Sequence, residues 1–194
     1  MQTLAHKDLF SLEDYDKQRD SFRERIILHK KNRIIFLNEN ASLHFEDRLT
    51  MQYQIQEMLR AEKIFESELI QEELDAYNPL IPDGTNWKAT FMLQYSDVAE
   101  RKHWLQKLTG IENHVWVRVG DNQLVYPISN EDMERTTEDK TSSVHFMRFE
   151  LTKGMVSDAQ AGANISMGID HPEFIVNINK LPDEIRVSLI SDLD

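Results

Sequence analysis

The residues best suited to chemistry are glutamates inside a predicted helix that is otherwise apolar along one side. Positions 48, 52, 55, 59, 62 and 66 fall close to one stripe of a 3.6-residue helix, so Glu62 shares a face with Ile55 and Leu59. A buried carboxylate is costly unless it is paired, hydrogen-bonded or bound to a metal. Glu62 is therefore expected to form an internal ion pair or to act as a metal ligand or acid–base group. Candidate ion-pair partners are Arg48, Arg60 and Arg148.

A second candidate is His145, which lies in a segment with strand character at 143–150. Side chains alternate across a strand, so His145, Met147 and Phe149 share one face and Arg148 and Glu150 the other. Beside such apolar neighbours, His145 is either a hydrogen-bonded core residue or a metal or catalytic ligand. Arg148 and Glu150 are expected to extend an ionic network.

Two acidic patterns on predicted helices allow metal binding but have simpler explanations. The run at 71–75 contains Glu72 and Glu73, which suit a hard cation or a solvated helix face. Glu100 and His103 have the Glu-x-x-His spacing of di-iron carboxylate bundles, in which it occurs twice, whereas this sequence has it once. Capping by Asp97 also explains Glu100.

The metal hypothesis takes its ligands from the helical carboxylates and the histidine of 143–150. Its candidate ligands are Glu62, Glu72, His145 and Glu150. Carboxylate and neutral imidazole suit iron, manganese or zinc. The sequence has no cysteine, which excludes disulfides, thiolate zinc sites and iron–sulfur clusters held by its own cysteines. Nucleotide-binding and hydrolase motifs are also absent, and whether the protein is an enzyme stays open.

Charge and hydropathy narrow the classes of partner. The net charge of −12 argues against nucleic acid and anionic membrane surfaces. No apolar run approaches the ~20 residues of a membrane span, and the first ten residues lack a signal-peptide core, so a soluble cytoplasmic protein is expected. A basic cluster around the end of the first helix is explained by the helix dipole or by an anion-binding patch. Its members are Arg23, Arg25, His29, Lys30, Lys31 and Arg33.

The elements that must position these side chains follow from periodicity and turn residues. Helices are predicted at 11–31, 49–65, 71–77, 97–108, 153–161 and 182–193, and strands at 33–37, 42–45, 90–95, 115–119, 123–128, 143–151, 163–169 and 174–178. Because strands come as neighbouring pairs, the prediction is an α+β fold with an antiparallel or mixed sheet and helices packed mainly on one side. The length favours a single domain over 1–194.

Helix ends carry recognisable signals. Ser11, Asp47 and Asp97 are predicted N-caps, and Gly110 a helix stop. Pro182 fits the first turn of the last helix.

Several blocks taken together resemble a bacterial family of uncharacterised proteins, domain-of-unknown-function family 3501. They are Phe-Glu-Asp-Arg at 45–48, Tyr-Gln-Ile-Gln-Glu-Met at 53–58, Ala-Tyr-Asn-Pro-Leu-Ile-Pro-Asp-Gly at 76–84, Lys-Ala-Thr at 88–90 and Lys-Thr-Ser-Ser-Val-His-Phe-Met-Arg-Phe-Glu at 140–150. The resemblance covers nearly the whole chain. It implies a setting in bacterial gene clusters that also encode rubrerythrin-like proteins and iron–sulfur proteins of heterodisulfide-reductase type.

The resemblance directs attention to the polar residues of these blocks. Together with Glu62, the candidate binding residues are Glu46, Asp47, Arg48, Gln54, Glu57, Asn78, Asp83 and Arg148. The leading hypothesis is an accessory protein that binds a rubrerythrin-like or iron–sulfur partner, and the alternative is a metal-binding protein or metal-dependent enzyme. A third hypothesis is an oligomerising module, such as a homodimer, that uses Trp87, Trp104 or Trp116, although each tryptophan also fits a core.

Overall fold

The computed structural model describes residues 3–137 and 139–194. Over these ranges the α-helices are Leu12–Lys30 (α1), Arg48–Glu62 (α2), Ser67–Tyr77 (α3), Val98–Lys107 (α4), Lys153–Gln160 (α5) and Asp183–Ile190 (α6). Short 3₁₀ turns occupy His6–Asp8 (η1), Asn78–Leu80 (η2) and Ile111–Asn113 (η3). No helix in this described part of the chain has the length and apolar character of a membrane span.

The strands form two antiparallel sheets. The five-stranded sheet has the order β1-β2-β3-β6-β5, built from Ile34–Phe36 (β1), Ala41–Phe45 (β2), Asn86–Leu93 (β3), Ile128–Ser129 (β5) and Val144–Glu150 (β6). The three-stranded sheet has the order β4-β7-β8, built from Val115–Val119 (β4), Ile165–His171 (β7) and Phe174–Ile178 (β8). All strand pairs are antiparallel. The predicted α+β class is confirmed.

The main core lies between the two sheets. Trp87, Ala89 and Phe91 on β3 are buried, while Lys88 and Thr90 between them are only half-buried. This alternation gives the five-stranded sheet one apolar face toward the other sheet and one polar, outward face. Buried side chains of both sheets form one continuous cluster.

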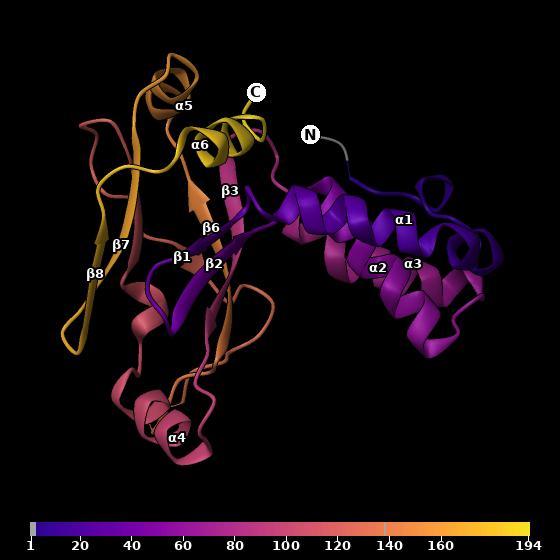
Figure 1. The fold of residues 1–194 in the computed structure, drawn as a ribbon, viewed down its shortest axis with the longest axis horizontal. Helices are drawn as coiled ribbons and strands as arrows, with labels where there is room; N and C mark the ends of the chain where they lie inside the picture. Colours follow the sequence, from indigo (N-terminus) through magenta and orange to yellow (C-terminus); the bar gives the residue numbers. More distant parts are fainter. Residues whose placement is uncertain (1–2, 138) are drawn as a thin grey trace.

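Helices α1, α2 and α3, with η1 and η2, form a separate layer that we call the helical arm (residues 3–32 and 47–81). In Figure 1 the arm lies to one side of the sheets, while α4 is at one end of the sheets and α5 and α6 are at the other. Two small apolar clusters hold the arm together. One is Leu4, Met51, Ile55, Leu59, Leu74 and Ile81, and the other is Tyr15, Phe22 and Ile26.

The predicted N-caps of α1, α2 and α4 are confirmed. Ser11, Asp47 and Asp97 each accept a hydrogen bond from the backbone N–H three residues later. Gly110 has φ of 84°, in the left-handed region that favours glycine. Pro182 precedes the first residue of α6.

The end of α2 departs from the prediction. The helix stops at Glu62 because Lys63 adopts a left-handed conformation with φ of 57°. Glu62 therefore lies at the exposed helix end, and the prediction that it is buried in an internal ion pair was wrong. The apolar stripe ends at Leu59, which is buried.

The predicted strand at 123–128 was also mostly wrong. Only Val125 bridges to Val117 of β4, and the chain then crosses to the other sheet, where β5 pairs with β6. The turn therefore returns the chain to β4 at this single bridge, and the residues that follow connect the two sheets.

Candidate functional site

A cleft of about 330 Å³ lies between the helical arm and the outward face of the five-stranded sheet. The arm contributes Asp75, Ala76, Pro79 and Leu80. The sheet and the loop after β5 contribute Lys88, Ile128, Glu131, Asp132, Phe146, Met147 and Arg148. We call this site the arm cleft. Its volume falls at the lower end of the range for small-molecule sites, which is about 300–1,000 Å³.

Antiparallel pairing places two cations side by side in the arm cleft. Lys88 on β3 and Arg148 on β6 are direct cross-strand partners, and Ile128 on β5 is the partner of Arg148 on its other side. Directly opposed side chains on one face have Cβ atoms about 4.5–5.5 Å apart. Two like charges at that distance need carboxylates to balance them.

Two carboxylates, Glu131 in the cleft and Glu150 beside it, bond Arg148. Its Nε and Nη2 donate to the two oxygens of Glu131, at 2.9 and 2.7 Å, and its Nη1 donates to Glu150 at 2.6 Å. The hydrogen bond from Arg148 lowers the pKa of Glu131, and the bond to Glu131 raises the pKa of Arg148. The predicted ionic contact between Arg148 and Glu150 is confirmed.

Lys88 is the less satisfied of the two cations. Its Nζ donates to the backbone oxygen of Pro79 at 2.5 Å, and in the described part of the chain it forms no ion pair. Burial lowers the pKa of Lys88 and Arg148 adds to that effect, while the carboxylates of Asp83, Glu131 and Glu150 act in the opposite direction. Lys88 is thus a half-buried cation available to a ligand.

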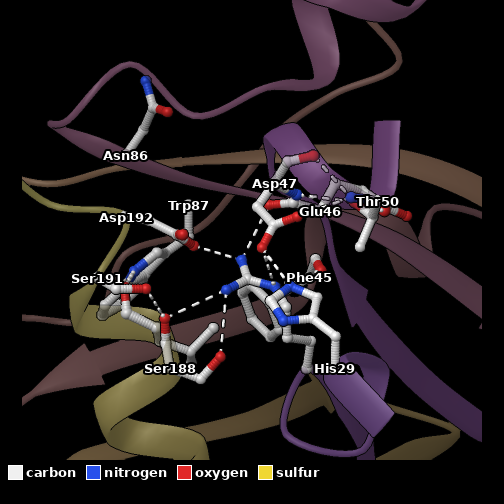
Figure 2. A network of polar contacts seen from close by, with 12 residues as sticks. His29, Phe45, Glu46, Asp47, Thr50, Asn86, Trp87, Ser188, Ser191 and Asp192 are labelled. Atoms are coloured by element: carbon white, nitrogen blue, oxygen red, sulfur yellow. Dashed lines mark hydrogen bonds and ion pairs between the residues drawn. The ribbon is translucent and has the colours of Figure 1, made fainter. Parts of the chain in front are cut away.

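The predicted residues Glu46 and Asp47 belong to an internal network at the junction of arm and sheets. Figure 2 shows His29 and Asp47 of the arm facing Ser188 and Asp192, which lie in and just after α6. The centre of the network is Arg33, whose side chain is 1% exposed.

Arg33 uses its full set of donors. It donates to the backbone oxygens of Phe45 and Glu46, both at 3.0 Å, and to Ser188 O at 3.2 Å and Ser188 Oγ at 3.3 Å. It also forms an ion pair with Asp192. Burial raises the pKa of Asp192 to about 6, while Arg33 acts in the opposite direction. Arg33 therefore joins β2 to α6.

Asp47 connects the same network to the arm. His29 Nε2 lies 2.6 Å from Asp47 Oδ2, and Arg33 Nε lies 3.4 Å from it. Burial acts to raise the pKa of Asp47, but His29 and Arg33 hold it below its usual value. Because Asp47 also caps α2, one carboxylate fixes the helix start and the arm–sheet junction.

Glu46 is a buried carboxylate with neutral partners. It accepts hydrogen bonds from Thr50 Oγ1 at 2.8 Å and from Thr90 Oγ1 at 2.9 Å. Burial raises its pKa. Its role in the described structure is to tie the start of α2 to β3.

Most other predicted binding residues make contacts within the arm. Arg48 pairs with Asp8 at 3.0 Å. Glu57 accepts two hydrogen bonds from Arg19, both at 2.8 Å, and one from Tyr15 at 2.6 Å.

The remaining three predicted binding residues lie apart from one another. Asn78 bonds the backbone N–H and C=O of Leu4. Asp83 accepts hydrogen bonds from Thr85 at the turn before β3. Gln54 is half-buried on α2. Among the nine candidate binding residues, only Arg148 lines the arm cleft.

His145 is fully buried and hydrogen-bonded. Its Nε2 lies 3.0 Å from Ser142 O and 2.8 Å from Thr141 Oγ1, and its Nδ1 lies 3.0 Å from the Asn130 side-chain nitrogen. Since Ser142 O only accepts and the Asn130 amide donates, these contacts fit a neutral ring with its proton on Nε2. Burial lowers the pKa of His145, which favours that neutral form.

The four predicted metal ligands do not converge. Glu62 and Glu72 are exposed on the arm, His145 lies within the sheet core, and Glu150 bonds Thr85, Asn86 and Arg148 at the start of β3. Within residues 3–137 and 139–194, no group of three or more His, Asp or Glu is placed to hold a metal ion. The described residues therefore provide no site that would support the metal hypothesis.

A second feature lies at the free edge of the five-stranded sheet, where α1 ends beside β1. Ile27, Lys30, Lys31, Ile34 and Phe36 line a hollow of about 400 Å³ that we call the β1 surface. Phe36 is 66% exposed and Ile27 is 52% exposed. In the part of the chain that the structure describes, neither lysine forms an ion pair.

Sequence reasoning missed the lysine of the arm cleft and the apolar residues of the β1 surface. Lys88 lies in one of the blocks that carry the family resemblance. Its alternation with buried neighbours on β3 was the pattern that could have indicated an outward-facing cation. Ile27 lies next to the stripe residue Ile26, and Phe36 lies on an edge strand. The basic cluster divides, since Arg33 is buried, His29 and Lys30 are half-buried and Lys31 is exposed.

The predicted tryptophan surface is not formed in the described structure. Trp87 and Trp116 are buried, and Trp104 is half-buried and stacks on Tyr95. All three belong to or pack against the main core.

Comparison with solved structures finds a close likeness over the full chain. The chain is 46% identical to a protein from Burkholderia pseudomallei K96243 whose crystal structure is described as that of a novel protein of unknown function. The match covers 100% of both chains with a TM-score of 0.94. A search of curated proteins finds no match. The family model described as "Protein of unknown function (DUF3501)" matches residues 3–193, and the chain belongs to that family.

Proposed function

We propose that this protein is a non-enzymatic accessory protein of the bacterial cytoplasm that binds an acidic protein partner through the β1 surface. The observation that carries the proposal is the exposure of Phe36 and Ile27 beside the free edge of a sheet. Large apolar side chains that gather at one hollow, with charge around them, are typical of protein interaction sites.

The chemistry of the β1 surface selects an extended acidic segment. A strand at the edge of a sheet presents unpaired N–H and C=O groups to which another strand can add. Phe36 and Ile27 offer apolar contact for alternate side chains, and Lys30 and Lys31 offer positive charge. The rest of the molecule is strongly acidic, with a net charge of −12. An acidic partner is therefore attracted to this surface and repelled elsewhere.

The family resemblance supplies the class of partner. It implies a setting beside rubrerythrin-like proteins and iron–sulfur proteins, so we propose that the partner is one of these. The sequence contains no complete catalytic motif that would favour an enzymatic activity of the protein itself. A redox reaction in that setting would take place on the partner.

Co-purification with the source bacterium's rubrerythrin-like and iron–sulfur proteins tests the proposal, under aerobic and anaerobic conditions. Phe36→Glu places a charge at the centre of the β1 surface and is expected to abolish co-purification. The matched control is Ile175→Glu, because Ile175 is 70% exposed on β8, remote in sequence from this surface. Failure of both proteins to co-purify, or equal loss in the two variants, would refute the proposal.

A second copy of the chain is the main competing occupant. Two copies joined edge to edge at β1 would bring two molecules of net charge −12 together, which is unfavourable. Sedimentation at several concentrations is therefore expected to give a monomer. A dimer that Phe36→Glu dissociates would assign the β1 surface to self-association and overturn the partner proposal.

A further inference from the structure

We infer that the arm cleft binds a small organic acid in which one carboxylate is attached to an apolar body, with Lys88 as the residue that receives the carboxylate. This site is separate from the β1 surface and shares no lining residue with it. The inference rests on the charge balance of the cleft and on the chemistry of its walls.

The first argument is that Lys88 forms no ion pair in the described structure, although Asp83, Glu131 and Glu150 attract it at longer range. The two carboxylates nearest in register, Glu131 and Glu150, are both engaged by Arg148 at 2.6–2.9 Å. Lys88 donates to a single carbonyl, that of Pro79, and an ammonium group has three N–H donors. A half-buried cation without a paired anion is costly, and an incoming carboxylate would remove that cost.

The second argument is that the other acidic residues that line the cleft form their contacts with side chains other than Lys88. Asp132 forms a bidentate contact with Arg135, at 2.5 and 2.7 Å. Asp75 accepts a hydrogen bond from Gln71 at 2.7 Å. Neither forms an ion pair with Lys88 in the described structure, so the lysine stays available to a ligand.

The third argument concerns the ligand's body. The remaining wall is apolar and comes from both sides of the cleft, with Ala76, Pro79 and Leu80 from the arm and Ile128 and Phe146 from the sheet. Arg135 lies over the Phe146 ring, 4.6 Å from its centroid, which helps to hold that ring in place. An apolar wall with one polar anchor is the usual composition of a small-molecule site.

Arg148 has a different role from Lys88. Its guanidinium is held by two carboxylates and has little capacity for a further anion. We assign it as a positioning residue, which holds Glu131 and Glu150 by hydrogen bonds so that neither forms an ion pair with Lys88 in the described structure.

Methyl NMR of the full chain tests the inference with phenylacetate as the probe. Binding is expected to shift the methyl signals of Leu80 and Ile128, which line the cleft, and to leave Ile175 on β8 unchanged. Hexanoate and cyclohexanecarboxylate extend the panel of apolar acids. Phenylacetamide has the same body without the charge and is expected to bind about tenfold more weakly or worse.

Two lysine variants make the test specific. Lys88→Met keeps the length of the side chain and removes its charge, and is expected to weaken phenylacetate binding by about tenfold or more. Lys153→Met is the matched control, because Lys153 is exposed on α5. The circular dichroism of both variants should match that of the unaltered protein.

Three results would overturn the inference. They are the absence of cleft shifts with all three acids, equal affinity for phenylacetate and phenylacetamide, and unchanged binding in a folded Lys88→Met variant. Phe36→Glu is expected to leave phenylacetate binding intact, so the arm cleft and the partner proposal can fail independently.

Discussion

At the scale of single residues, the buried charges of this protein serve mainly to join its parts. Arg33 connects β2 to the end of α6 through two backbone carbonyls and Asp192. Glu46 connects the start of α2 to β3. A buried ion pair is weak evidence for net stability, but removing one partner leaves an uncompensated charge inside the protein.

Arg33→Met is therefore expected to lower the free energy of unfolding by about 3–5 kcal/mol, since it leaves Asp192 buried without its cation. Urea denaturation followed by circular dichroism measures this loss. Arg23→Met is the matched control, because Arg23 is exposed on α1, and its effect should stay within about 0.5 kcal/mol. A loss below about 1 kcal/mol in Arg33→Met would show that the network does not hold the junction.

The contact between Arg19 and Glu57 predicts a pH dependence. The hydrogen bond from Arg19 lowers the pKa of Glu57 in the folded protein, whereas the unfolded value is about 4.3. The resulting stabilisation is present above the unfolded pKa and is lost as the pH falls through the folded pKa. Because the pair is about a quarter exposed, solvent screens it and the effect is small.

Glu57→Gln tests this dependence by comparison with the unaltered protein. The difference in their free energies of unfolding should be constant above about pH 6 and shrink below about pH 4. Glu13→Gln, at an exposed glutamate on α1, is the control and should show a smaller difference throughout. A difference that grows as the pH falls would contradict the assignment.

At the scale of the elements, close packing of the second sheet depends on one glycine. A Cβ atom at Gly168 on β7 would lie 2.3 Å from Val176 O and 2.4 Å from the Trp116 ring. Both neighbours belong to paired strands, so they have little room to move. Gly168 thus permits Trp116 to pack across β7.

Gly168→Ala is expected to destabilise the protein by about 1–3 kcal/mol, the usual cost of overpacking. Gly154→Ala in α5 is the control, because the nearest atom to its Cβ is 3.8 Å away. Alanine is the better helix former there, so the control should be neutral or stabilising by about 0.5 kcal/mol. Thermal unfolding of the two variants measures the contrast, and equal effects would contradict it.

Local signals explain which elements could be predicted from the sequence. The N-caps Ser11, Asp47 and Asp97 and the hairpin of β1 and β2 depend on neighbouring residues, and all were predicted. The end of α2 was missed because the left-handed conformation of Lys63 has no sequence signal comparable to a glycine. The division into two sheets was missed because pairing between β3 and β6 joins distant segments.

The same distinction applies to the candidate site. Arg148 and its ionic contact with Glu150 followed from strand alternation alone. The arm cleft could not be predicted from such local patterns, since its walls come from α3, η2 and three strands whose proximity is set by tertiary packing. Glu62, Glu72 and His145 were grouped by chemistry, and the fold does not bring them together.

At the scale of the whole molecule, charge is distributed unevenly over the protein. The net charge is −12, yet Lys30 and Lys31 stand at the β1 surface without ion pairs in the described structure. An acidic partner would meet attraction at one edge and repulsion over most of the remainder.

Partner binding should therefore weaken as salt rises from about 0.05 M to about 0.5 M, because the screening length falls below 10 Å in that range. Titration calorimetry at several salt concentrations measures the trend. The double variant Lys30→Gln, Lys31→Gln should bind more weakly and depend less on salt, while Lys153→Gln should behave as the unaltered protein. Binding that strengthens with salt would point to a purely apolar contact.

Amide hydrogen exchange of the protein alone and in complex with its rubrerythrin-like or iron–sulfur partner tests the central claim most directly. The proposal predicts slower exchange over residues 27–36, at the end of α1 and along β1, with residues 174–178 of β8 unchanged. Protection confined to 174–178, or to the arm cleft with none at 27–36, would contradict it.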